Sequence, residues 1–208
     1  MIMLRRHPER SAGFTLLEVL VAVAVYAVFA LLAYAGLMRM LEGRDRVEAE
    51  REKWRTLTLA FAQMEDDLAQ AHARGVRDAG GATLPAFRGQ PVDTRALGDP
   101  SVEFTRAGMF LPDEGVASDL RRVAYRFKEG TLLRLTWPTL DRPPTGEPRA
   151  VQLLSNADNV TFRFHAANGG WSDRWPITEE KNVLPDAVEF AFDIASVGRV
   201  TRVFLVAQ

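Results

Sequence analysis

The sequence has 208 residues and contains no cysteine. This excludes disulfide bonds and thiolate metal sites, and it is equally compatible with a cytosolic and a periplasmic protein. Proline is absent between Phe14 and Arg74, where the only glycines are Gly36 and Gly43. Because proline breaks helices and glycine weakens them, this stretch is free to form one helix of about 60 residues.

The sequence also lacks an excess of charge of either sign. It has 26 Lys and Arg against 27 Asp and Glu, which gives a net charge of −1. A protein that binds DNA or RNA usually carries a basic surface, so we expect no nucleic-acid partner.

Catalytic signatures are missing as well. The sequence contains no GxSxG motif, no P-loop and no GxGxxG motif. The three histidines, His7, His72 and His165, do not form a pair with metal-ligand spacing. Asp66 and Asp67 are adjacent on a predicted helix and point to different faces, so we interpret them as a solvated flank rather than a cation site. We therefore expect no catalytic residue, no metal and no cofactor.

The most informative feature is an uncharged run of 20 residues, 19–38, VLVAVAVYAVFALLAYAGLM. At about 1.5 Å per residue, a helix of this length crosses the hydrocarbon core of a bilayer, which is about 30 Å thick. Glu18 directly precedes the run. A carboxylate at membrane depth is costly and therefore indicates a function, unless it points back to the lipid headgroups.

The apolar run does not have the features of a cleaved secretory signal. It is longer than the usual apolar region of such signals, about 7 to 15 residues. It also does not end in a small-x-small cleavage site, because Ala33-Tyr34-Ala35 is followed by Gly36-Leu37-Met38 and then by a charged helical segment. Basic residues flank the run on both sides, so charge alone does not predict its orientation in the membrane.

Apolar residues continue at helical spacing after the run, as one stripe between charged residues. The stripe comprises Leu37, Leu41, Val47, Trp54, Leu57, Phe61, Met64, Leu68 and Ala71. Arg74 followed by Gly75 predicts the end of the helix, with Gly75 as the C′ residue. We expect a β-sheet domain to pack on the stripe over residues 47–71.

The rest of the chain has the pattern of a β domain. Residues 75–101 are rich in glycine and proline and predict a connection made of loops. Alternating apolar and polar residues then predict strands. These are 102–106, 121–128, 131–137, 150–154, 159–165, 187–194 and 199–207. Turns are predicted at Glu129-Gly130 and at 196–198. The expected fold class is α+β, a long helix packed on a mostly antiparallel sheet.

The N-terminal phrase GFTLLEVLVA, residues 13–22, resembles the processing signal of type IV pilins and pseudopilins. The resemblance implies that prepilin peptidase cuts between Gly13 and Phe14 and that the new amine of Phe14 is methylated. It also implies that Glu18 forms a salt bridge with the N-terminal amine of a neighbouring subunit. Loss of residues 1–13 removes three arginines and one glutamate, which leaves 23 basic and 26 acidic residues and a net charge of −3.

Further stretches resemble one branch of this superfamily, the J-type minor pseudopilins of type II secretion systems. The similar stretches are FAQMEDDLAQ (61–70), RGVRD (74–78), PAFRG (85–89), FTRAG (104–108), SDLRRVAY (118–125), LRLTWP (133–138), Trp171, Trp175-Pro176 and LPDAVE (184–189). Glu18 argues against the K type, which usually lacks this acid.

The resemblance to J-type pseudopilins implies an organisation and a role for the chain. It divides the chain into a leader (1–13), a transmembrane half-helix (14–41), a periplasmic amphipathic half-helix (42–74) and a periplasmic β-rich domain (75–208). The protein is expected to cross the inner membrane once. It is expected to join the I, K and H types in a pseudopilus tip complex that primes assembly for export of folded proteins.

Two alternatives remain at this point. The chain also fits a minor type IV pilin of a pilus or competence system, or, in a different class, a signal-anchored periplasmic binding module or enzyme. Trp171 and Trp175 flank an Asp-Arg pair and are candidates for anchoring a partner, although we expect them to pack in the core or in a loop.

Overall fold

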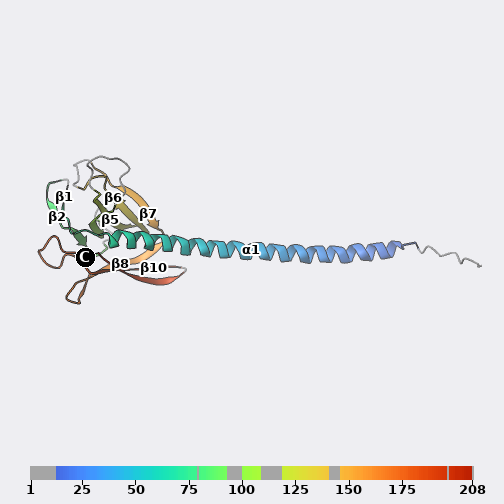
Figure 1. The fold of residues 1–208 in the computed structure, drawn as a ribbon. Helices are drawn as coiled ribbons and strands as arrows, with labels where there is room; N and C mark the ends of the chain where they lie inside the picture. Colours follow the sequence, from blue (N-terminus) through green and yellow to red (C-terminus); the bar gives the residue numbers. More distant parts are fainter. Residues whose placement is uncertain are drawn as a thin grey trace, which may run out of the picture. The chain divides into compact units, whose positions relative to one another are not determined.

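A computed structural model describes residues 13–78, 80–92, 100–108, 119–140, 146–195 and 197–207. It contains one long helix, α1 (Leu16–Ala69), and the chain divides into two compact units, Met1–Lys53 and Trp54–Gln208 (Figure 1). The leader, residues 1–12, lies outside the described part of the chain.

Helix α1 begins where the sequence supplies an N-cap. The Thr15 side-chain oxygen accepts a hydrogen bond from the backbone N–H of Glu18 at 3.3 Å, and the Thr15 carbonyl accepts one from Val19 at 3.2 Å. Residues 13–56 are all exposed in the isolated chain. By length and composition, this helix is apolar enough to cross a membrane.

Two antiparallel sheets form the body of the second unit (Figure 1). The five-stranded sheet has the order β3 (Phe87–Gly89), β4 (Val102–Arg106), β5 (Arg121–Lys128), β6 (Thr131–Thr136), β7 (Arg149–Leu154). The four-stranded sheet has the order β11 (Gly198–Leu205), β10 (Ala187–Ile194), β8 (Ala157–His165), β9 (Trp171–Ser172). A small pair consists of β1 (Val76–Arg77) and β2 (Thr83–Leu84).

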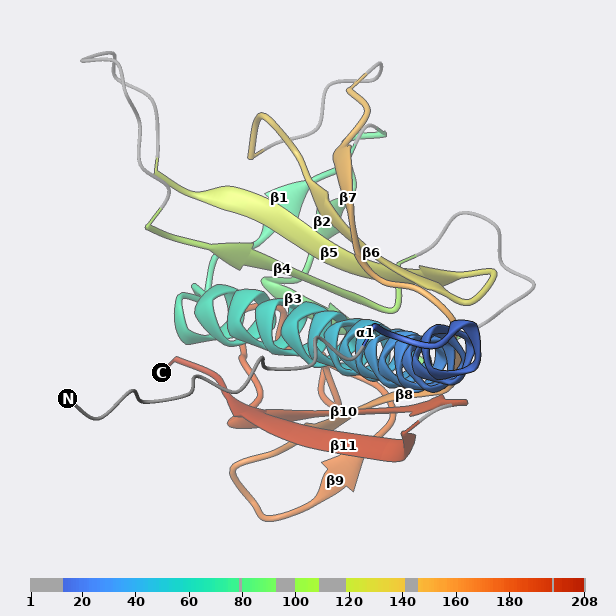
Figure 2. The same cartoon turned by 90° about the vertical axis from the view of Figure 1, so that its right-hand side faces the viewer.

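The last turns of α1 lie between the two larger sheets, as Figure 2 shows. Leu57, Ala60, Met64 and Leu68 supply the buried face of the helix. They belong to one apolar core that includes residues of both sheets. The aromatic members of this core are Phe87, Phe104, Tyr125, Phe162, Phe164, Trp175, Phe190, Phe192 and Phe204. The sequence predicted an α+β fold with a helix packed on antiparallel strands, and the structure confirms it with sheets on both sides of the helix.

The period-two pattern located the longer strands well. All seven predicted strands are present, with ends that differ from the prediction by at most two residues. The turn at Glu129-Gly130 joins β5 to β6, and both residues have positive φ, 49° and 74°. Positive φ at both central positions is the type I′ geometry that matches the twist of a hairpin. Strands β10 and β11 also form a hairpin, whose ends pair as Ile194 and Gly198. Of the turn predicted at 196–198, residue 196 lies outside the described part of the chain.

Three details differ from the prediction. First, α1 ends at Ala69 and not at Arg74, because the backbone beyond it pairs with β4. The N–H of His72 donates to the Thr105 carbonyl at 2.8 Å, and the N–H of Ala107 donates to the Gln70 carbonyl at 2.9 Å. Gly75 is therefore not a C′ residue. A Cβ there would lie 2.9 Å from the Leu84 carbonyl oxygen, so this glycine allows the β1–β2 backbones to approach closely.

Second, burial along the helix starts later than the stripe suggests. Val47 and Trp54 are each 53% exposed, and the first buried helical residue is Leu57. Third, the region predicted as loops, 75–101, contains the short strands β1, β2 and β3. Strands of two or three residues have too few positions to show a period.

Candidate functional site

The residues predicted for processing and assembly lie together at the start of α1. Phe14 is 79% exposed, and a Cβ built on Gly13 would meet no atom within 4 Å. Glu18 is exposed in the first turn of the helix, and within the described residues its carboxylate has no hydrogen bond or ion pair. The peptide bond between Gly13 and Phe14 is therefore open to a protease, and the Glu18 carboxylate is open to an external partner.

Thr15 is part of this site, and the sequence interpretation missed it. Its side chain caps the helix, and Thr15-Leu16-Leu17-Glu18 has the spacing of a capping box, in which a threonine precedes a glutamate by three residues. The cap fixes Glu18 in the first turn, where the positive end of the helix dipole favours a carboxylate. The signal that reveals Thr15 is the T-x-x-E spacing in front of an apolar run.

A second acidic side chain of α1 is fully buried. Asp67 is 0% exposed and lies against the five-stranded sheet. Arg134 binds it with two hydrogen bonds, Nε to Oδ2 at 2.6 Å and Nη2 to Oδ1 at 2.8 Å. The Tyr125 hydroxyl donates to Oδ2 at 2.5 Å, and Arg106 donates to Oδ1. Two cations and a phenol therefore surround one carboxylate.

Burial changes the acid–base properties of this cluster. Burial and the negative charge of Asp67 raise the pKa of Tyr125 well above its usual value, so its hydroxyl stays a donor. Burial alone would lower the pKa of Arg134, but its hydrogen bonds to Asp67 and the charge of that carboxylate raise it. The raised pKa values of Tyr125 and Arg134 therefore keep both side chains as hydrogen-bond donors to Asp67.

The prediction that Asp66 and Asp67 form a solvated flank is wrong for Asp67. Asp66 is 53% exposed and contacts Arg106 at 3.0 Å, whereas Asp67 faces the core. The spacing contained the necessary signal, because Asp67 follows Ala60 by seven residues and Met64 by three, which places it on the buried stripe. The two arginines that bind it are on strands far away in the sequence, and no local pattern connects them to Asp67.

A second buried ion pair lies within the five-stranded sheet. The Nε of Arg122 donates to Glu103 at 2.8 Å, and the two side chains are 0% and 1% exposed. Arg122 also donates to the Ala86 carbonyl at 2.8 Å and to the Thr105 hydroxyl at 3.1 Å. These contacts tie the segment before β3 to β4 and β5.

The two tryptophans singled out in the sequence have different surroundings. Trp175 is 6% exposed and donates from Nε1 to the Val183 carbonyl at 2.9 Å, so the packing role predicted for it is confirmed. Trp171 on β9 is 38% exposed. The guanidinium of Arg163 lies 5.5 Å from its ring centroid, and the His165 ring meets it edge-on at 5.0 Å. Trp171 therefore remains partly accessible.

Known proteins resemble this chain over most of its length. The family described as type II secretion system (T2SS), protein J, matches residues 35–206, and the prokaryotic N-terminal methylation motif matches residues 9–34. A type II secretion system protein J from Klebsiella pneumoniae is 29% identical over 204 residues, which cover 95% of this chain and 96% of the relative. One from Vibrio cholerae serotype O1 is 28% identical over 199 residues, 95% of this chain and 88% of the relative.

A solved structure has the same fold. It is a chain in the crystal structure of the GspK-GspI-GspJ complex from the enterotoxigenic Escherichia coli Type 2 Secretion System. The TM-score is 0.64 at 26% identity, and the match covers 75% of this chain and 98% of the other. The sequence and structure comparisons therefore agree on one family.

Proposed function

The chain belongs to the type II secretion system protein J family and is a minor pseudopilin of that system, and we propose how its N-terminus serves assembly. Prepilin peptidase removes residues 1–13, the new N-terminal amine of Phe14 is methylated, and Glu18 pairs with the N-terminal amine of a neighbouring subunit. The helix from residue 14 to 41 anchors the protein in the inner membrane, and the β domain lies in the periplasm.

The proposal rests on the accessibility of the N-terminal segment and on the motif that this segment matches. Gly13 and Phe14 are accessible, and the methylation motif spans both residues. Glycine at a scissile position allows a protease backbone to approach closely. Removal of the leader takes away three arginines, after which a short N-terminus, whose only charges are the new amine and Glu18, can reach the hydrocarbon.

Glu18 supplies a register for subunit packing in this mechanism. A carboxylate in hydrocarbon gains a partner when the neighbouring amine lies opposite, whereas a subunit docked one step away leaves both charges buried and unpaired. The cost of such an unpaired charge is several kcal/mol, which is enough to select one register. Apolar helix packing through the small residues of the run then completes the contact.

The partners follow from the solved relative. A chain with this fold is part of a complex of GspK, GspI and GspJ. We infer that this chain likewise joins I-type and K-type pseudopilins, with the H type below, and that it acts by assembly in the export of folded proteins.

The first test concerns the mature N-terminus. Mass spectrometry of the full-length protein from its native membranes should find a methylated Phe14 as the first residue. A protein that retains the arginine-bearing leader contradicts the proposal.

The second test concerns Glu18. Glu18→Ala should reduce crosslinking of the chain to other minor pseudopilins by tenfold or more, because the amine of the neighbour loses its counter-charge. Glu48→Ala is the matched control, since Glu48 is an exposed acid on the same helix. Equal crosslinking by the two variants would remove Glu18 from the assembly mechanism.

A further inference from the structure

The four-stranded sheet has one face toward α1 and one face directed away from it, which we call the outer face (Figure 2). Phe190 and Phe204 point toward the helix, because both are buried in the core that the helix shares. Successive side chains of a strand point to opposite faces, so Val203 and Leu205 lie on the outer face. Leu205 is 78% exposed and Val203 is 49% exposed. At β11, the last strand of the sheet, the outer face therefore carries two uncovered apolar side chains.

The register of the strands places Leu205 in one row with three other side chains. Its cross-strand partner is Ala187, which lies opposite His165 on β8, and His165 lies opposite Trp171 on β9. Opposite residues in an antiparallel pair share a face, so this first row crosses all four strands. Its length is about 14 Å at a strand spacing of about 4.8 Å. Trp171 is 38% exposed, so the first row presents an accessible apolar side chain at each edge of the sheet.

The charges of the next row compensate each other. In this second row Val203 lies opposite Glu189, which lies opposite Arg163. The Arg163 guanidinium is 3.5 Å from the Glu189 carboxylate. The first row contains one titratable group, His165, and Asp186 lies 3.7 Å from its Nδ1. The two rows together therefore offer apolar surface without an uncompensated charge.

Exposed apolar side chains of the second unit are concentrated in these two rows. Among the described residues after Ala60, the exposed large apolar side chains are Val151, Trp171, Ile177, Val203 and Leu205. Three of these five belong to the two rows. The Arg163 guanidinium lies 5.5 Å from the Trp171 ring centroid, and tryptophan and arginine are enriched among the residues that dominate interfaces. A cluster of this kind on the surface of a chain marks a contact with another protein.

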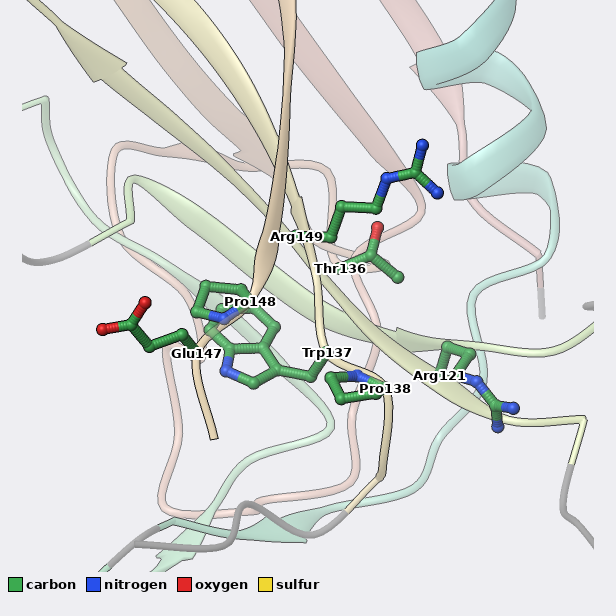
Figure 3. Close-up of a pocket in the computed structure, with 7 residues that line it drawn as sticks. All are labelled: Arg121, Thr136, Trp137, Pro138, Glu147, Pro148 and Arg149. Atoms are coloured by element: carbon green, nitrogen blue, oxygen red, sulfur yellow. The ribbon is translucent and has the colours of Figure 1, made fainter. Parts of the chain in front are cut away.

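A cavity on the five-stranded sheet also has an apolar wall, but its tryptophan is already covered. The cavity measures about 410 Å³ and lies over the end of β6 (Figure 3). Trp137, Pro138 and Pro148 supply the apolar wall, and Figure 3 shows Pro148 beside the Trp137 ring. Trp137 is 5% exposed, so little of its surface is left for a partner, whereas Trp171 on the outer face is partly exposed.

We propose that the two rows of the outer face bind an apolar, uncharged surface of another minor pseudopilin. The partner packs across the four strands, with Val203 and Leu205 at one border of the contact and Trp171 at the other. Charge complementarity identifies the partner surface as uncharged, because the charges of the two rows already have counter-charges within the chain. The choice of a pseudopilin as partner rests on the proposed function, since a chain with this fold is part of a complex of GspK, GspI and GspJ.

Site-specific photo-crosslinking in the full-length chain tests this inference. Val203→p-benzoylphenylalanine places the probe in the second row, in cells that contain all minor pseudopilins. Val151→p-benzoylphenylalanine is the matched control, since Val151 is an exposed valine on the last strand of the other large sheet. The probe at Val203 should crosslink to an I-type or K-type pseudopilin, at a peptide of mostly apolar residues, with at least ten times the yield of the control.

Four results of this experiment would overturn the inference. The first is an equal yield of the same product from both positions. The second is a crosslink from Val203 only to a second copy of this chain or to an exported protein. The third is a crosslink to a peptide of mostly charged residues, and the fourth is no crosslink from Val203.

A charge introduced into the first row gives a second test. In the chain with the probe at Val203, Leu205→Asp should lower the crosslink yield by tenfold or more, whereas Leu205→Met, which keeps an apolar side chain, should preserve it. Leu205 is 78% exposed, so the urea denaturation curve of Leu205→Asp should match that of the unsubstituted chain. An unchanged crosslink yield in a folded Leu205→Asp variant would overturn the inference.

The proposed function and this inference can fail separately. A methylated Phe14 and Glu18-dependent crosslinking in the same cells would show that the proposed function stands even where the Val203 crosslink is absent. A retained leader together with the expected Val203 crosslink would contradict the proposed processing and would support the outer face as the binding surface.

Discussion

Glu18 and Asp67 are acidic side chains at the two ends of one helix, α1, and their surroundings are opposite. Asp67 is fully buried and receives hydrogen bonds from Arg106, Arg134 and Tyr125. Glu18 is exposed, and within the described residues its carboxylate has no partner. Its neighbours in sequence are apolar residues suited to a membrane.

The comparison separates folding from assembly. The chain supplies both sides of the Asp67 cluster, so this cluster contributes to the stability of the domain. For Glu18 the chain supplies one side, and under the proposed function a second subunit supplies the other. Each carboxylate needs a counter-charge in a medium of low dielectric constant, and the difference lies in where that counter-charge comes from.

The largest effect should come from Asp67→Asn, which leaves Arg106 and Arg134 without their shared counter-charge. We expect the free energy of unfolding of the full-length protein in detergent to fall by about 3–5 kcal/mol. Urea denaturation followed by tryptophan fluorescence measures it. Asp66→Asn is the matched control and should cost less than about 1 kcal/mol, because Asp66 is 53% exposed. Glu18→Ala should leave the unfolding curve unchanged. A shift equal to that of Asp67→Asn would contradict the distinction between a carboxylate that stabilises the domain and one that serves assembly.

A smaller loss of the free energy of unfolding is expected from Gly89→Ala. This variant tests how closely the two sheets pack against each other beside the helix. A Cβ on Gly89 would overlap the ring of Phe164, which is 0% exposed, so the ring has to move. Overpacking of this kind costs about 1–3 kcal/mol. Gly170→Ala is the control, since its Cβ would contact only Asn168 Oδ1 at 3.8 Å. Equal stability of the two variants would mean that the sheets separate without cost at Gly89.

The Asp67 cluster also predicts a dependence on alkaline pH. Burial, and then Asp67, raise the folded pKa of Tyr125 above that of an unfolded tyrosine, which is about 10. The unfolded chain therefore loses this proton first, so the contribution is complete below pH of about 10 and is lost as pH rises further. The loss is up to about 1.4 kcal/mol per pH unit.

Tyr125→Phe isolates this contribution. The variant should lose about 1–2 kcal/mol at neutral pH with its hydrogen bond to Asp67, and the part of the alkaline slope that depends on Tyr125 should vanish. Urea denaturation of both proteins between pH 8 and 11 measures the two effects. Parallel curves above pH 10 would show that Tyr125 ionises equally in both states.

The smallest change in the free energy of unfolding is expected at the hairpin turn between β5 and β6. Glu129 has a φ of 49°, a conformation that disfavours most side chains and that asparagine tolerates. Glu129→Asn should raise the free energy of unfolding by about 0.5 kcal/mol, while Gly130→Ala should lower it by about 1 kcal/mol. Denaturation curves of both variants give the sign, and destabilisation by Glu129→Asn would argue against a type I′ turn there.

Much of the fold was predictable because its signals are local. The period-two pattern placed all seven longer strands, and Glu129-Gly130 predicted a tight hairpin. The short strands β1, β2 and β3 escaped, since two or three residues do not define a period. The surroundings of the two carboxylates, Glu18 and Asp67, were predictable to different degrees. The start of α1 contains a contiguous phrase from Gly13 to Glu18, whereas the Asp67 cluster joins residues from α1, β4, β5 and β6.

The sequence by itself determined the uncharged run of residues 19–38, the N-terminal motif before it, and the positions of the seven longer strands, since each depends on neighbouring residues. Only the tertiary structure decided that α1 ends at Ala69, that its burial starts at Leu57, and that Asp67 lies between two arginines. These outcomes depend on backbone and charge partners that are distant in sequence. A carboxylate on a helix is solvated or buried according to what packs against it, and local spacing alone does not supply that partner.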